Sequence, residues 1–99
     1  MIIDRSEFEL LLEESIPELE ALSERTGRSD PHLQNILVQL RAAREATENG
    51  SLITSDLAER FNFGVQAMRI LMGDDDEDLG FRLMNLADYL AQHLVTTGR

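Results

Sequence analysis

Residues 54–72 read TSDLAERFNFGVQAMRILM, and the fold of the chain depends on how this apolar stretch packs. Part of it repeats at spacings of three and four residues, which indicates an α-helix. This stripe consists of Leu57, Phe61, Val65, Met68 and Met72. Four further apolar residues lie off this stripe: Phe63, Ala67, Ile70 and Leu71. A helix that is apolar on so many sides is enclosed by other helices or by a partner chain, and we expect it to be the core element.

Residues 54–72 fit two arrangements. As one helix they would carry Gly64 at a cost of about 1 kcal/mol in helix propensity. As a helix-turn-helix they would turn at Asn62-Phe63-Gly64 and use residues 65–72 as the recognition helix. That motif usually has glycine where Asn62 stands, and Arg69 is the one basic residue of the second half. Because phosphate contacts supply much of the affinity for DNA, a chain with a net charge of −10 is poorly suited to bind it, and we expect no nucleic-acid partner.

Three other segments have helical spacing and recognisable ends. The first begins with the capping box Ser6-Glu7-Phe8-Glu9, and we expect Pro17 to divide it into two abutting helices, because proline lacks the backbone donor. The second runs from Asp30-Pro31 to Asn49-Gly50. The third follows the acidic residues 74–78 and carries a leucine stripe.

Four helical arms joined by short turns predict a single all-α domain over residues 1–99. Its architecture would be a compact antiparallel bundle of four helices, or of five if Pro17 breaks the first. The helix-turn-helix-like central segment is the competing arrangement.

The net charge of −10 is concentrated in two places. Residues 4–24 hold eight acidic residues and one arginine, and residues 74–78 are all acidic. Such surfaces would attract a basic protein. The alternative is that the charge maintains solubility or reflects the source organism, because all nine basic residues are arginine and none is lysine.

No catalytic or metal-binding motif is complete in the sequence. The absence of cysteine excludes disulfides, thiolate metal sites and cysteine nucleophiles. An EF-hand loop starting at Asp74 would need glycine and glutamate where Leu79 and Asn85 stand. Glu45 and Glu48 have the E-x-x-E spacing of Mg²⁺-dependent all-α nucleotide pyrophosphatases, but a second pair on a facing helix is missing. We expect no enzyme, cofactor or bound metal, and this pyrophosphatase is the weakest alternative.

Flexible or large apolar residues gather between positions 61 and 84, and within residues 61–72 the apolar positions outnumber what one core-facing stripe requires. The flexible or large residues are Phe61, Phe63, Met68, Met72, Phe81 and Met84. They either fill the core or, in part, line an adaptable groove or a dimer face, as methionine-rich surfaces do. This surplus is the best sequence evidence for a partner.

These features predict a small acidic protein-binding module without catalytic activity, comparable in size and class to inhibitors, immunity or anti-defence proteins and chaperone-like adaptors. It would cover a basic protein, as a monomer or as a homodimer, and a helix-turn-helix transcriptional regulator is the main alternative. One apolar patch and two acidic surfaces would make the contacts. The predicted contact residues are Phe63, Ile70, Met72, Glu13, Glu14, Glu20, Asp74, Asp75 and Asp76.

The sequence also indicates where the protein acts. It has no apolar run near the roughly 20 residues of a membrane span. Its first residues are acidic, whereas secretory and mitochondrial leaders are basic. We therefore expect a cytoplasmic protein.

Overall fold

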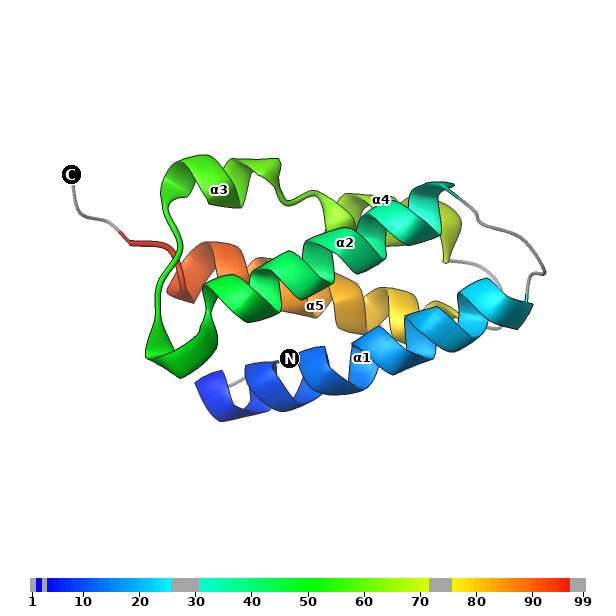
Figure 1. Ribbon diagram of the computed structural model, residues 1–99, viewed down its shortest axis with the longest axis horizontal. Coiled ribbons are helices and arrows are strands. Elements are labelled where there is room, and N and C mark those ends of the chain that lie inside the picture. The colour runs from blue at the N-terminus through cyan, green and yellow to red at the C-terminus, as the bar shows by residue number, and fades with distance from the viewer. Residues whose placement is uncertain (1, 3, 26–30, 72–75, 97–99) are drawn as a thin grey trace.

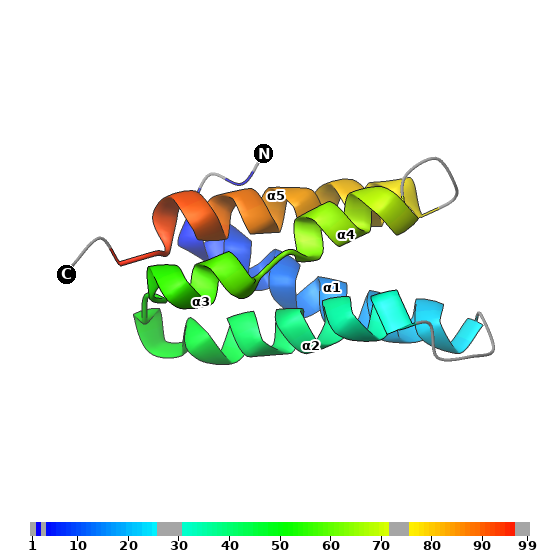
Figure 2. The ribbon, with the colours of Figure 1, turned by 90° about the horizontal axis from the view of Figure 1, so that it is seen from above.

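Five α-helices follow one another in the described part of the computed structural model, which comprises residues 2, 4–25, 31–71 and 76–96. They are α1 (Arg5–Arg25), α2 (Pro31–Ala46), α3 (Ser55–Arg60), α4 (Phe63–Ile70) and α5 (Glu77–His93), and a short 3₁₀ turn, η1 (Glu48–Gly50), follows α2. Helices α3 and α4 lie one after the other along the long axis and form one arm (Figure 1). Each of the four arms runs opposite to the arm before it in the chain (Figures 1 and 2).

The four arms form a closed ring. Helix α1 packs on α2, α2 on α4, α4 on α5, and α5 on α1. The apolar residues buried between them come from every arm and from the link before α3. They are Phe8, Leu12, Ile16, Leu19, Leu22, Leu33, Ile36, Leu37, Leu40, Ala43, Ile53, Phe63, Ala67, Leu71, Leu79, Leu83, Leu86, Leu90 and Leu94. The predicted all-α antiparallel bundle is confirmed. Among the described helices, none combines the length and the apolar character that crossing a membrane requires.

Helix α1 continues through Pro17, so the predicted division at this residue is wrong. Pro17 lies on the exposed side of the helix, where water can bind the carbonyl that its missing N–H leaves unpaired. The buried side runs past it without interruption, from Ile16 to Leu19. Proline inside a helix costs about 3 kcal/mol, whereas burying two large apolar side chains gains roughly 3–6 kcal/mol. Packing therefore keeps the helix in one piece.

Helix ends follow local side-chain chemistry. Asp4, rather than the predicted Ser6, caps α1, because its Oδ1 accepts a hydrogen bond from the Glu7 N–H at 2.8 Å. Thr54 caps α3, because its side-chain oxygen accepts a hydrogen bond from the Leu57 N–H at 3.1 Å. After α2 the chain reverses through Asn49 and Gly50, with φ angles of 58° and 80°. This is the left-handed conformation that asparagine and glycine tolerate best.

Residues 54–72 divide into α3 and α4 at Phe61 and Asn62. The Asn62 N–H donates to Oε1 of Gln39 at 2.7 Å, and Nε2 of Gln39 donates to Oδ1 of Asn62 at 2.6 Å. Gln39 is buried on α2. The two hydrogen bonds therefore satisfy the Asn62 N–H, which has no helical partner, and hold the break against α2. The two helices continue in one direction along the bundle (Figures 1 and 2), whereas those of a helix-turn-helix cross at roughly 90–120°.

Candidate functional site

An open groove runs between the α3–α4 arm and α5. It has a volume of about 260 Å³. Its lining residues are Phe61, Asn62, Gly64, Val65, Met68, Met84, Ala87 and Asp88. We call it the α4–α5 groove. Its walls are mainly apolar, and Asn62 and Asp88 supply its polar side chains.

The floor of the groove depends on two small residues. A β-carbon built on Gly64 would lie 2.8 Å from Cβ of Ala87 and 3.7 Å from Cα of Met84. The absence of a side chain at position 64 therefore lets α4 approach the backbone of α5 closely. Because both floor residues are small, the longer side chains on either side stand above them as walls.

Several apolar side chains around the groove are about half exposed to solvent. Val65 and Met68 on α4 are 49% and 48% exposed, and Phe81 on α5 is 48% exposed. Phe81 does not line the groove, but it precedes Met84 by three residues and so lies on the same side of α5. Leaving several large apolar side chains exposed side by side is typical of a surface that binds another molecule.

The exposed side of α4 is the reverse of the predicted one. Phe63 was expected to contact a partner, but it is 1% exposed and belongs to the core, so its assignment to a surface patch is wrong. Ile70 is partly buried against the same core. Met72 lies outside the described residues. The break at residues 61–62 and the contact of Gly64 with α5 turn α4 so that the predicted inward stripe, Val65 and Met68, faces out.

The other predicted surfaces are partly engaged within the chain. Glu13 pairs with Arg44 at 3.6 Å, and Glu20 pairs with Arg41, so two acidic residues of α1 contact α2. Asp76 pairs with Arg25 at 3.4 Å. Their role in partner binding stays a prediction.

The remaining predicted contacts fall into two groups. Glu14 is exposed and makes no ion pair within the described part of the chain. Asp74 and Asp75 lie outside the described residues.

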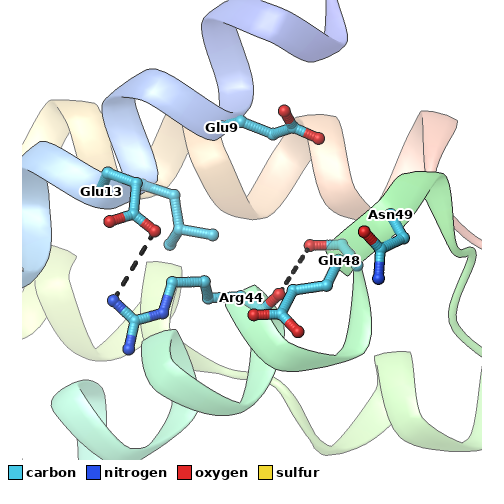
Figure 3. A pocket seen from close by; sticks show the side chains of 7 residues that line it. Glu9, Glu13, Arg44, Glu48 and Asn49 are labelled. Atoms are coloured by element: carbon cyan, nitrogen blue, oxygen red, sulfur yellow. Dashed lines mark hydrogen bonds and ion pairs between the residues drawn. The ribbon is translucent and has the colours of Figure 1, made fainter.

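A second, more polar cavity of about 230 Å³ lies between α1 and the end of α2 (Figure 3). Its lining residues are Glu9, Leu12, Glu13, Arg44, Thr47, Glu48 and Asn49. Two of its carboxylates are paired with arginine, Glu13 with Arg44 and Glu9 with Arg5. Glu45, the other member of the E-x-x-E pair, does not line it. Within the described residues no three His, Cys, Asp or Glu side chains are grouped so as to hold a metal ion.

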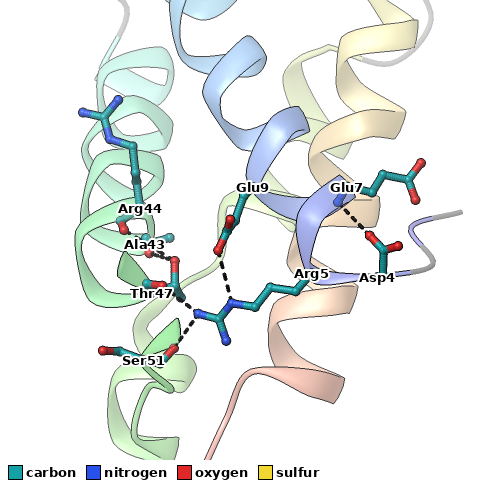
Figure 4. Close-up of polar contacts among 8 residues, drawn as sticks. All are labelled: Asp4, Arg5, Glu7, Glu9, Ala43, Arg44, Thr47 and Ser51. Atoms are coloured by element: carbon teal, nitrogen blue, oxygen red, sulfur yellow. Dashed lines mark hydrogen bonds and ion pairs between the residues drawn. The ribbon is translucent and has the colours of Figure 1, made fainter. Parts of the chain in front are cut away.

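Arg5 joins the start of α1 to the end of α2 beside this cavity (Figure 4). Its Nη2 donates to the carbonyl oxygens of Thr47 and Ser51 at 2.6 and 2.7 Å, and its Nε lies 3.3 Å from Oε2 of Glu9. These contacts satisfy carbonyl groups that the end of α2 leaves without helical partners. This polar cluster accounts for local structure. The α4–α5 groove is the candidate functional site because its lining is mainly apolar and includes the half-exposed Val65 and Met68.

The charges near the groove are free to act on a partner. Asp88 lines the groove, is exposed and makes no ion pair in the described part of the chain. Of the arginines that the structure describes, only Arg60 and Arg69 lack an ion pair, and both lie on the α3–α4 arm. Arg41 and Arg44, by contrast, are paired with acidic residues of α1.

Comparisons with models of protein families, with curated proteins and with solved structures yield no match for this chain. Its class is therefore defined by the fold and by the groove. It is an all-α antiparallel bundle of four arms with an open, mainly apolar groove between α4 and α5.

Proposed function

We propose that this chain is a small acidic protein-binding module without catalytic activity, an inhibitor or adaptor that covers a basic protein. The α4–α5 groove is its main contact surface. The observation that carries the proposal is the apolar lining of this groove, in which Val65 and Met68 are half exposed. Phe81, which is exposed to the same degree, adds to it on the Met84 side of α5. Burying such side chains in an interface contributes roughly 25 cal/mol per Å² of apolar surface.

The composition of the groove supports a protein partner. Its two methionine side chains, Met68 and Met84, are long and flexible, so they can adapt to an irregular apolar surface. Phe61 adds a rigid aromatic side chain, of the kind enriched at interfaces, and Phe81 exposes a second one on the Met84 side of α5. Other exposed large apolar residues, such as Leu10 on α1 and Val38 on α2, do not line the groove.

The charge of the chain supports a basic partner. The net charge is −10, and the positive charge of the described arginines is mostly neutralised by ion pairs within the bundle. Unpaired acids remain at the groove, in Asp88, and on α3, in Asp56 and Glu59, where they outnumber the two unpaired arginines of the α3–α4 arm. Long-range attraction of this kind speeds the encounter with a basic protein, and the apolar groove would then hold the complex.

Affinity capture with matched variants tests the proposal. The immobilised chain is mixed with lysate of the source cell at low salt, and bound material is eluted by salt and identified by mass spectrometry. Met68→Asp places a charge in the groove, and Val38→Asp makes the same kind of change at a similarly exposed residue of α2. We expect one basic protein to be captured by the wild type and by Val38→Asp, and captured about tenfold less by Met68→Asp.

Three results would contradict the proposal. Equal capture by all three forms would show that the groove is not the contact surface. Recovery of DNA would favour a transcriptional regulator instead. Recovery of nothing except the chain itself would favour self-association.

A further inference from the structure

We infer that the occupant of the α4–α5 groove is an amphipathic α-helix of the partner, with basic residues beside its apolar stripe. This inference rests on the proposed function and specifies the form and the charge of the segment that the groove receives.

The backbone around the groove explains why the occupant is helical. Six of the eight lining residues lie on α4 and α5, where backbone N–H and C=O groups are paired within the helices. The other two, Phe61 and Asn62, lie in the break before α4, and their N–H groups donate to the Ala58 carbonyl and to Gln39 Oε1. In the described residues the one β-bridge joins Ile53 to Val95, and neither residue lines the groove. An extended segment would therefore bury its own backbone groups without partners, which costs about 1–3 kcal/mol for each group. A helix pairs its backbone groups internally and brings only side chains to the groove.

The spacing of the groove residues also matches a helix. On one wall Val65 and Met68 of α4 are three residues apart, and on the other Met84 and Ala87 of α5 are three apart. Side chains at these intervals form ridges along a helix, and a third helix packs by placing its own ridge between two such rows. The groove, with a volume of about 260 Å³, is the space into which that ridge would fit.

Asp88 determines the charge of the occupant. Its carboxylate lines the groove and has no ion-pair partner in the described residues. An occupant that is only apolar would remove water from this carboxylate and offer no positive charge in return, which is unfavourable. A lysine or arginine beside the apolar stripe of the occupant would pair with Asp88. Arg69 lies one turn beyond Val65, on the exposed side of α4 and outside the groove lining, where it can contact an acidic residue on the far flank of the same helix.

Synthetic peptides test this inference with the full 99-residue chain. Three peptides of about 18 residues, or five helical turns, are compared by fluorescence anisotropy. The first has leucines at helical spacing and a lysine-rich polar face. The second has the same leucines with glutamates in place of the lysines. The third has the lysines but scrambled leucine positions.

The inference predicts a ranked result. At low salt the first peptide binds about tenfold more tightly than either of the others. Met68→Asp removes that binding, and Val38→Asp retains it. Asp88→Asn lowers the preference for the basic over the acidic peptide by about threefold, and Glu45→Gln, which removes an exposed acid on α2, leaves it unchanged.

Different failures have different meanings. Equal binding of the first and third peptides would show unspecific attraction to an acidic chain and would overturn the inference. Equal binding of the first and second, abolished by Met68→Asp, would overturn the charge assignment while the groove remained the contact surface. If the chain alone sediments as a dimer that Met68→Asp dissociates, a second copy is the occupant, and both the inference and the proposed function fail.

Discussion

Gly64 on α4 and Ala87 on α5 lie so close that a β-carbon at position 64 would stand 2.8 Å from Cβ of Ala87. This approach brings the two helices together and also forms the floor of the α4–α5 groove. Gly64 lowers helix propensity, but because it has no side chain it allows α4 to pack closely on α5. The same contact turns Val65 and Met68 toward solvent.

Gly64→Ala tests this contact. Alanine raises helix propensity by about 1 kcal/mol, but the overlap with Ala87 should cost about 1–3 kcal/mol, so we expect net destabilisation in urea unfolding. Adding Ala87→Gly should restore part of the loss, because it removes the overlapping methyl group. A single Gly64→Ala variant that is more stable than the wild type would contradict the close approach of α4 to α5.

Pro17→Ala should stabilise the protein. The substitution restores a backbone donor inside α1 at an exposed position, and we expect a gain of about 1–3 kcal/mol in the free energy of unfolding, measured by thermal denaturation. Pro31→Ala, at the first position of α2 where proline is well tolerated, serves as the control and should change stability little. Loss of stability in Pro17→Ala would mean that α1 needs the proline to fit against its neighbours.

Ser15→Ala should also stabilise the protein or leave it unchanged. Ser15 is completely buried, and its hydroxyl has no hydrogen-bond partner in the part of the chain that the structure describes. Removing a buried unpaired hydroxyl avoids a desolvation penalty of about 1 kcal/mol, and alanine favours the helix. The midpoint of urea unfolding measures the effect. A clear destabilisation would reveal a partner for the Ser15 hydroxyl.

Gln39→Leu should loosen the junction of α3 and α4. It places an apolar side chain on α2 and leaves the Asn62 N–H without its acceptor, while Oδ1 of Asn62 keeps only the hydrogen bond from Gln66 Nε2. We expect a loss of about 1–3 kcal/mol in the free energy of unfolding. Hydrogen exchange should accelerate at Asn62 while the centre of α1 stays protected. An unchanged exchange rate at Asn62 would show that Gln39 does not hold the junction.

The sequence was sufficient to predict the fold because the leucine and isoleucine stripes of three arms have clear helical spacing. The second arm illustrates this, since its residues at helical spacing, Leu33, Ile36, Leu37 and Leu40, are all buried. The predicted division at Pro17 is wrong because it rests on the low helix propensity of proline alone, whereas the buried apolar face of α1 continues past this residue. In such cases tertiary packing outweighs the cost of one backbone hydrogen bond.

The site was harder to predict than the fold. Residues 54–72 offer apolar side chains on nearly every side, so periodicity alone cannot tell which of them face the core. That choice depends on the Gln39–Asn62 pair and on the Gly64–Ala87 contact, both of which join residues more than 20 positions apart. The surplus of methionine and phenylalanine was a usable signal, because Phe61, Met68 and Met84 all line the groove.

The central claim is that the α4–α5 groove is covered when the partner binds. Hydroxyl-radical footprinting tests it directly, because methionine and phenylalanine side chains are readily oxidised and their oxidation reports solvent exposure. In the complex with the captured basic protein, Met68 and Phe81 should become protected, while Leu10 and Val38 should be oxidised as in the free chain. Protection of Leu10 or Val38, with Met68 and Phe81 unchanged, would place the interface elsewhere and contradict the account.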